Sequence, residues 1–274
     1  MTKHSESLGD QWHCLLDDPG QIIPGMALVI AQEGGTREAW KRVTARHETV
    51  LLAFPPDVPI RGAVIVRGEP EGEMKAKSVL PLLEGLPNDM TIAEVYPWKS
   101  DVEGAVAARR NEDADPIWFY TPFLFRDRDD LTPGVRQTIL LAGLAYGLRR
   151  ALVDEMTITS GPSYEEYAAL WLAENPGKTR LDVPQLKVPL AGARILESGG
   201  LLCEYQLRAP ITSVETVNFG PETVYLLRLS FGLHTENPLE LAIYASARIC
   251  KNYVPRADDE IEAYVWLQGR MLDL

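Results

Sequence analysis

The side chains that most often carry catalysis are few in this chain of 274 residues. It contains four histidines, at positions 4, 13, 47 and 234, and no Gly-x-Ser-x-Gly turn. A nucleophile needs a positioned base, and that base is most often histidine. The sequence therefore favours a non-catalytic protein. An enzyme with an unfamiliar acid–base or metal-dependent site is the alternative, and it requires a fold that brings His47 or His234 to a carboxylate.

The phosphate-binding and metal-binding patterns are incomplete. Residues 176–179 read Pro-Gly-Lys-Thr, like the end of a P-loop, but Leu172 stands where that pattern requires a glycine. Acidic clusters at 127–130 and 258–262 lack the spacing of a calcium loop. The three cysteines have neither metal-type nor redox-type spacing. We expect no metal and no cofactor.

Basic residues form two groups against a net charge of −12. The first group lies on a helix predicted over 36–46, where Thr36 is the expected cap and basic side chains recur four residues apart. The second group, Arg149 and Arg150, is explained by the dipole at the end of a predicted helix. The helical group could contact an anion or an acidic partner, and the alternative is an ordinary solvated face. Arg126 and Arg128 follow an aromatic run at 116–125 and alternate with acidic residues.

The aromatic run at 116–125 is the most apolar stretch of the chain. Both of its faces are apolar at strand spacing, and Pro122 cannot donate to a ladder, so we expect an edge or bulged strand. The Trp118 and Tyr120 face must then be covered by the helix expected after Thr132 or by a partner chain. The predicted partner-binding residues are Trp118, Tyr120, Arg126, Arg128, Arg37, Lys41 and Arg42.

The predicted fold class is α+β, in three parts. A small mixed α/β N-terminal unit, residues 10–110, follows a flexible tail, residues 1–9. Residues 116–274 supply two central helices and an antiparallel β-barrel-like or sandwich-like C-terminal unit. The predicted helices span 36–46, 78–83, 101–110, 132–152 and 163–173. The predicted strands span 27–30, 50–54, 63–66, 91–96, 156–159, 193–196, 201–207, 213–217, 224–231, 239–245 and 261–268.

The last predicted strand carries one resemblance. Residues 255–269 form a turn, an alternating strand and an exit glycine, and this pattern is similar to strands of OB-type and other small barrels. The resemblance implies binding of a single-strand oligonucleotide through aromatic side chains such as Tyr264 and Trp266. Packing of the same aromatic side chains against the predicted central helices is the preferred interpretation.

Charge and hydropathy point to a soluble protein. The acidic balance disfavours a general nucleic-acid binder, which needs a basic surface. Residues 1–10 lack an apolar signal core, and the apolar run at 139–148 is too short to cross a bilayer. We expect a cytoplasmic protein without membrane contact that binds a protein partner or associates with itself.

Overall fold

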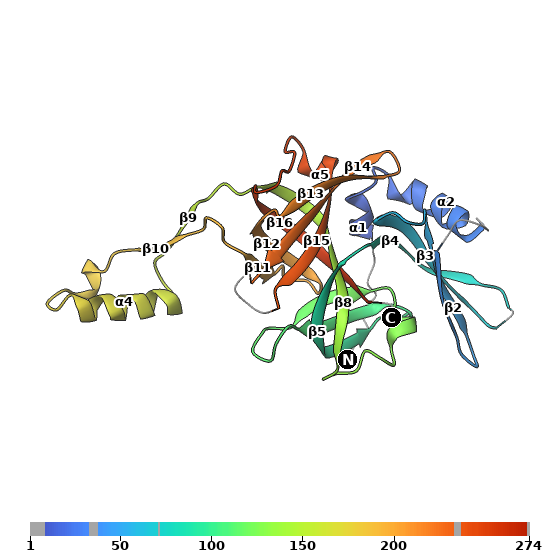
Figure 1. Ribbon diagram of the computed structural model, residues 1–274, viewed down its shortest axis with the longest axis horizontal. Coiled ribbons are helices and arrows are strands. Elements are labelled where there is room, and N and C mark those ends of the chain that lie inside the picture. Colours follow the sequence, from blue (N-terminus) through green and yellow to red (C-terminus); the bar gives the residue numbers. More distant parts are fainter. Residues whose placement is uncertain (1–8, 33–37, 71, 233–236, 273–274) are drawn as a thin grey trace. The chain divides into compact units, whose positions relative to one another are not determined.

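Strands dominate the computed structural model, which describes residues 9–32, 38–70, 72–232 and 237–272 (Figure 1). The chain divides into two compact units. Residues 151–193 form the smaller unit, and the segments before and after it together form the larger unit. The smaller unit is therefore an insertion between two parts of one folded body.

Four antiparallel strands in sequence order make the first sheet of the larger unit. They are β1 (Glu38–Val43), β2 (Glu48–Phe54), β3 (Ile60–Gly68) and β4 (Lys75–Leu83). Side chains alternate between the faces of a strand, so each strand presents one set to each side. The outer face, with Leu52 and Val64, packs against Ile30 of α2 (Pro19–Gln32). The inner face, with Leu51 and Ile65, packs into the main core.

The second sheet has ten strands, and five of them close into a ring. The ring runs β5–β6–β7–β16–β8 and back to β5. Its strands are β5 (Leu86–Pro97), β6 (Gly104–Arg109), β7 (Ile117–Thr121), β8 (Arg136–Arg150) and β16 (Glu260–Met271). The remaining strands are β11 (Ile195–Ser198), β12 (Glu204–Pro210), β13 (Ser213–Phe219), β14 (Glu222–Phe231) and β15 (Leu239–Ser246). The long strands β8 and β16 connect the ring to the remaining strands, because β16 also pairs with β12 and β8 also pairs with β15.

Short helices cover parts of these sheets. α1 (Gly9–His13) places Trp12 in the core, where its indole N–H donates to the carbonyl oxygen of Val79 at 3.1 Å. α3 (Leu124–Asp127) directly follows β7, and α5 (Ala247–Cys250) directly follows β15. Among the described residues, none of the helices is long and apolar enough to cross a membrane.

The smaller unit contains two strands, one α-helix and one 3-10 turn. β9 (Glu155–Ile158) pairs antiparallel with β10 (Leu186–Pro189). Between them lie α4 (Pro162–Glu174) and the 3-10 turn η1 (Arg180–Asp182). An ion pair between Arg180 and Glu165 connects the turn to the helix.

The predicted α+β class with two central helices is wrong, because the chain is mostly sheet. The helix expected over 132–152 is the strand β8. Its residues 139–145 are buried on both faces, and such a continuous apolar run has no alternation that would separate a strand from a helix. Two sheets pack against this strand, and their contacts override its local helical spacing.

Four shorter predictions are also wrong. The helix expected over 36–46 is the strand β1 at 38–43, while Thr36 and Arg37 lie outside the described residues. Residues 78–83 belong to β4 and residues 104–109 to β6, where helices were expected. Residues 27–30 lie in α2, where a strand was expected. Each error concerns a short segment, whose local preference is weak compared with its tertiary contacts.

The other predicted elements are confirmed. The strands expected at 50–54, 63–66 and 91–96 are parts of β2, β3 and β5. The helix expected over 163–173 is α4, and the strand before it is β9. The six strands expected after 193 correspond to β11–β16. These segments have clear alternation or clear turn residues at their ends.

Candidate functional site

The aromatic run enters the core of the larger unit. Tyr120 is fully buried between Trp98 and Trp266, with ring centroids 4.8 and 5.0 Å away. Its hydroxyl donates to Glu103 at 2.6 Å, and burial together with this carboxylate raises the pKa of Tyr120 well above 10. Trp98 and Trp266 therefore provide the cover that the sequence left open. A partner cannot reach the Tyr120 side chain in this structure.

Trp118 lies two residues before Tyr120 on the same strand and is half-buried. Its backbone N–H donates to the hydroxyl oxygen of Tyr205 at 2.7 Å. Trp118 thus lies close to β12. Because Tyr120 is fully buried, it contributes nothing to a surface.

A row of three residues crosses the inner face of the first sheet. Arg42 of β1 is the direct neighbour of Thr49 of β2, and Thr49 is the direct neighbour of Arg67 of β3. Direct neighbours in a sheet point to the same face. The next row on this face is apolar, with Trp40, Leu51 and Ile65. The sheet therefore presents two guanidinium groups and a hydroxyl group at the edge of its apolar core.

This row lines a pocket of about 120 Å³, which we call the basic pocket. The other side of the pocket comes from segments that connect strands of the second sheet: Phe125 of α3, Arg128 after it and Asp101 from the turn before β6. The complete lining is Arg42, Thr44, His47, Thr49, Arg67, Asp101, Phe125 and Arg128.

The three guanidinium groups of the basic pocket have different partners. Arg42 donates to the carbonyl oxygens of Phe125 and Arg126, at 3.1 and 3.2 Å, and pairs with Asp129 at 2.7 Å. Arg128 pairs with Asp101 at 2.9 Å. These contacts fix both side chains against α3 and the turn beside it.

Arg67 is the least satisfied of the three. Its Nη1 donates to the carbonyl oxygen of Ser100 at 3.3 Å. Its Nε is buried and has no hydrogen-bond partner among the described residues. In that part of the chain no carboxylate pairs with it either.

The structure brings together three of the seven predicted residues. Arg42, Arg126 and Arg128 lie around α3, and the Arg126 guanidinium covers the Phe123 ring at 4.6 Å from its centroid. Lys41 points to the opposite face of β1 from Arg42 and pairs with Glu48 at 2.6 Å. The predicted helical spacing of Lys41 and Arg42 was wrong, and the contact of Arg42 with residues 125–129 was not foreseen.

Sequence reasoning missed Arg67 and Thr49. Arg61 and Arg67 lie six positions apart on β3 and share a face, but both lie outside the strand predicted at 63–66. Arg67 and Thr49 lie beside Arg42 only because of the register of three strands. Local sequence does not reveal that register.

His47 and Asp101 lie in the same pocket, which is the arrangement that an enzyme would require. Arg128, however, donates to both carboxylate oxygens of Asp101, at 2.9 and 3.5 Å. The carboxylate of Asp101 therefore already has a basic partner. His234 lies outside the described residues, and in the described part of the chain no three His, Cys, Asp or Glu side chains form a metal-binding group.

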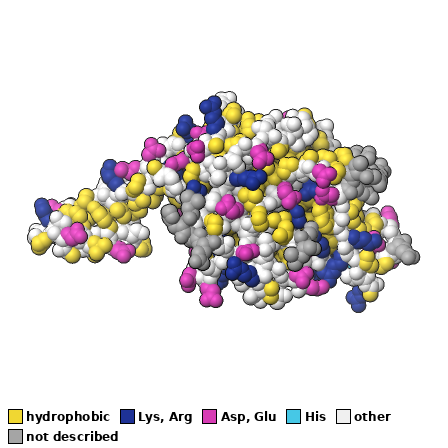
Figure 2. All heavy atoms as spheres, in the orientation of Figure 1, with side chains coloured by type: hydrophobic (Ala, Val, Ile, Leu, Met, Phe, Trp, Pro, Cys, Tyr) yellow, Lys and Arg dark blue, Asp and Glu magenta, His cyan; other side chains and the backbone are white. Residues whose placement is uncertain are grey.

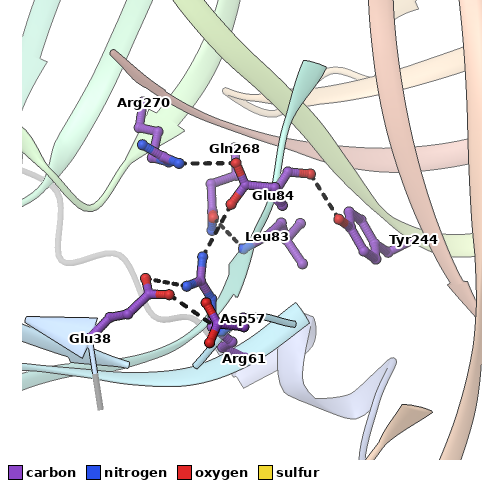
Figure 3. Close-up of polar contacts among 8 residues, drawn as sticks. All are labelled: Glu38, Asp57, Arg61, Leu83, Glu84, Tyr244, Gln268 and Arg270. Carbon is purple, nitrogen blue, oxygen red and sulfur yellow. Dashed lines mark hydrogen bonds and ion pairs between the residues drawn. The ribbon is translucent and has the colours of Figure 1, made fainter. Parts of the chain in front are cut away.

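A second polar cluster lies at the opposite end of the same inner face (Figure 3). Arg61, whose side chain is 4% exposed, pairs with Glu38 and with Glu84. Glu84 also pairs with Arg270 of β16 at 3.0 Å, and its carbonyl oxygen accepts from Tyr244 of β15 at 2.8 Å. These ion pairs and this hydrogen bond join the two sheets, so the cluster has a structural role.

The smaller unit exposes a large apolar surface. Of residues 151–193, all of which the structure describes, only Ala168 and Val183 are buried. Leu181 is 98% exposed, and apolar side chains are prominent on the visible face of this unit (Figure 2). The exposed large aliphatic side chains are Leu152, Val153, Met156, Leu170 and Leu181.

Comparison with known proteins adds no relative: no protein-family model, no curated protein and no solved structure matches this chain.

Proposed function

We propose that this chain is a non-catalytic interaction protein and that residues 151–193 contact its protein partner. The observation that supports the proposal is the imbalance of burial in this unit. It buries two side chains and exposes five large aliphatic ones. Exposed large apolar side chains gathered in one small unit fit a protein–protein contact site.

The secondary structure of the unit supports the same interpretation. An isolated two-stranded ladder is marginally stable in water, and one helix cannot complete a core with it. Burying the exposed apolar surface would contribute about 25 cal/mol for each Å² removed from water. A partner that covers Leu170 and Leu181 would supply this burial.

Charge indicates what the partner surface is like. Acidic residues outnumber basic ones in residues 151–193, and two of the three basic side chains already form internal pairs, Arg180 with Glu165 and Lys187 with Glu155. Opposite charges around an interface guide association and fix its register. We therefore expect a partner surface that is apolar at its centre and basic at its rim.

The test compares three forms of the full chain: the native form, the double variant Leu170→Glu/Leu181→Glu and the control Val254→Glu. Both substituted leucines and Val254 are exposed, so the folded body should tolerate all three changes. Light scattering measures self-association first. An oligomer that the double variant loses and the control keeps identifies a second copy as the partner.

If the native chain is monomeric, the three forms serve as matched baits in cross-linked extracts of the natural host. A protein retained by the native and control forms and lost by the double variant supports the proposal. A monomeric chain whose three forms recover the same proteins overturns it. Replacing residues 151–193 by a Gly-Ser linker should abolish the same contact while leaving the far-UV spectrum of the larger unit intact.

A further inference from the structure

We propose that the basic pocket binds a phosphate group, as inorganic phosphate or as the end of a phosphomonoester. This site is separate from residues 151–193 and does not depend on the proposed protein contact. Its chemistry is defined by three guanidinium groups, of Arg42, Arg67 and Arg128, and by two threonine hydroxyl groups. Guanidinium groups present donors in a planar fork that matches phosphate and carboxylate oxygens.

The charge balance of the pocket favours an anion. Three arginines line it, and the two carboxylates that pair with them are those of Asp101 and Asp129. A net positive site is therefore present in a chain whose net charge is −12. Arg42 and Arg67 lie on the inner sheet face, beside a row of apolar side chains.

Arg67 provides a second observation that fits an anion. Its side chain is half-buried, and a buried donor normally has an acceptor. Arg67 has neither a carboxylate partner nor an acceptor for its Nε in the described part of the chain. An anion in the pocket would supply the countercharge, and it would offer the guanidinium an acceptor.

The preformed geometry lowers the cost of binding. The carbonyl oxygens of Phe125 and Arg126 orient Arg42, and the carboxylate and carbonyl oxygens of Asp101 orient Arg128. Side chains that are already ordered lose less entropy when the ligand arrives. The volume of about 120 Å³ is well below that of pockets for drug-sized ligands and suits one small group.

Isothermal titration calorimetry of the full chain tests the proposal with inorganic phosphate, O-phosphoserine and acetate at constant ionic strength. We expect phosphate or phosphoserine to bind more tightly than acetate. Arg67→Met should weaken binding by about tenfold or more, because hydrogen bonds to charged groups are the strong ones. Arg149→Met is the matched control: it removes an exposed guanidinium that pairs with Glu262, and it should leave binding unchanged.

Asp101→Asn separates binding from a purely structural role. It removes the carboxylate that competes for Arg128, so phosphate should bind more tightly, whereas a structural role predicts only lower stability. Phosphoserine binding as tight as phosphate binding identifies the end group as the ligand, and phosphate binding alone identifies the free ion. Acetate binding as tight as phosphate binding, or equal binding by the native chain and Arg67→Met, overturns the proposal.

Discussion

The hydroxyl group of Tyr205 connects two segments that are far apart in the sequence. It accepts the backbone N–H of Trp118 at 2.7 Å and lies beside the edge of the aromatic run. Burial raises the pKa of Tyr205 to about 12 from an ordinary value of 10.0, although the Trp118 N–H lowers it in part. One buried side chain therefore affects both stability and its dependence on pH.

Tyr205→Phe should lower the free energy of unfolding by about 1–2 kcal/mol at neutral pH, because the N–H of Trp118 loses its acceptor. Urea unfolding followed by tryptophan fluorescence measures the change. A variant as stable as the native chain would show that water replaces the hydroxyl group without cost.

The same variant reveals the pH dependence. The folded state holds the Tyr205 proton up to about pH 12, whereas the unfolded state releases it near pH 10. The unfolded state thus binds fewer protons between these values, and stability falls as pH rises through that range. The stability advantage of the native chain over Tyr205→Phe should shrink as the pH rises from about 9 to about 11. A constant difference would contradict the assigned pKa.

Strand β8 shows how one element is shaped by neighbours on all sides. Gly143 faces β15 and β16, where an added Cβ would lie 2.7 Å from Ile243 Cδ1 and 3.1 Å from Leu267 Cδ2. Gly147, four residues later, has no atom within 4 Å of such a Cβ. On a helix these two glycines would share a face and a role, but on this strand their surroundings differ.

Gly143→Ala should destabilise the protein by about 1–3 kcal/mol through overpacking. Gly147→Ala is the matched control and should be neutral or stabilising by up to about 1 kcal/mol, because alanine restricts the unfolded chain. Thermal and urea unfolding of both variants provide the measurement. Equal effects of the two substitutions would contradict the register of β8 with β15 and β16.

The inner face of β1–β3 carries two polar sites that are separated by an apolar row. It carries the basic pocket at one end and the Arg61 cluster at the other, with the row of Trp40, Leu51 and Ile65 between them. Trp40 meets the Phe123 ring edge-on, with centroids 5.2 Å apart. The strand alternation of β1 therefore determines which of its side chains reach each site.

The whole larger unit depends on contacts between its two sheets. Arg61 extends from the first sheet to Glu84, and Glu84 in turn binds Arg270 of the second sheet (Figure 3). Gln268 of β16 completes the connection, since its side chain accepts from the Leu83 N–H and donates to the Pro81 carbonyl oxygen, both at 2.9 Å. These contacts fix the first sheet against the ring.

Arg61→Met should therefore lower the free energy of unfolding of the larger unit by about 2–3 kcal/mol, since it breaks a buried ion pair whose carboxylates are partly solvated. Arg149→Met removes an exposed pair and should cost at most about 1 kcal/mol. Urea unfolding with fluorescence detection compares the two. Similar small effects would show that the apolar core alone holds the sheets together.

Several local features could be predicted from the sequence. The alternation of β16, the turn residues between β11 and β16, and the Asn-Pro end of α4 identify these elements because local geometry and local polarity agree. The predicted Ser163 cap of α4 was wrong, because the helix begins at Pro162 with Gly161 as its N-cap. The arginines near the aromatic run were also recognisable as a charged group. The absence of complete catalytic motifs led to the proposal of a binding protein, which the experiments above address.

The sequence by itself determined where strands with clear alternation lie. Only the tertiary structure decided that 136–150 is a strand, that Trp98 and Trp266 cover Tyr120, and that Arg42 and Arg67 flank Thr49. The physical reason is that these facts arise from strand register and from packing between distant segments. A residue on a buried strand takes its role from neighbours across the sheet, and local periodicity carries no record of them.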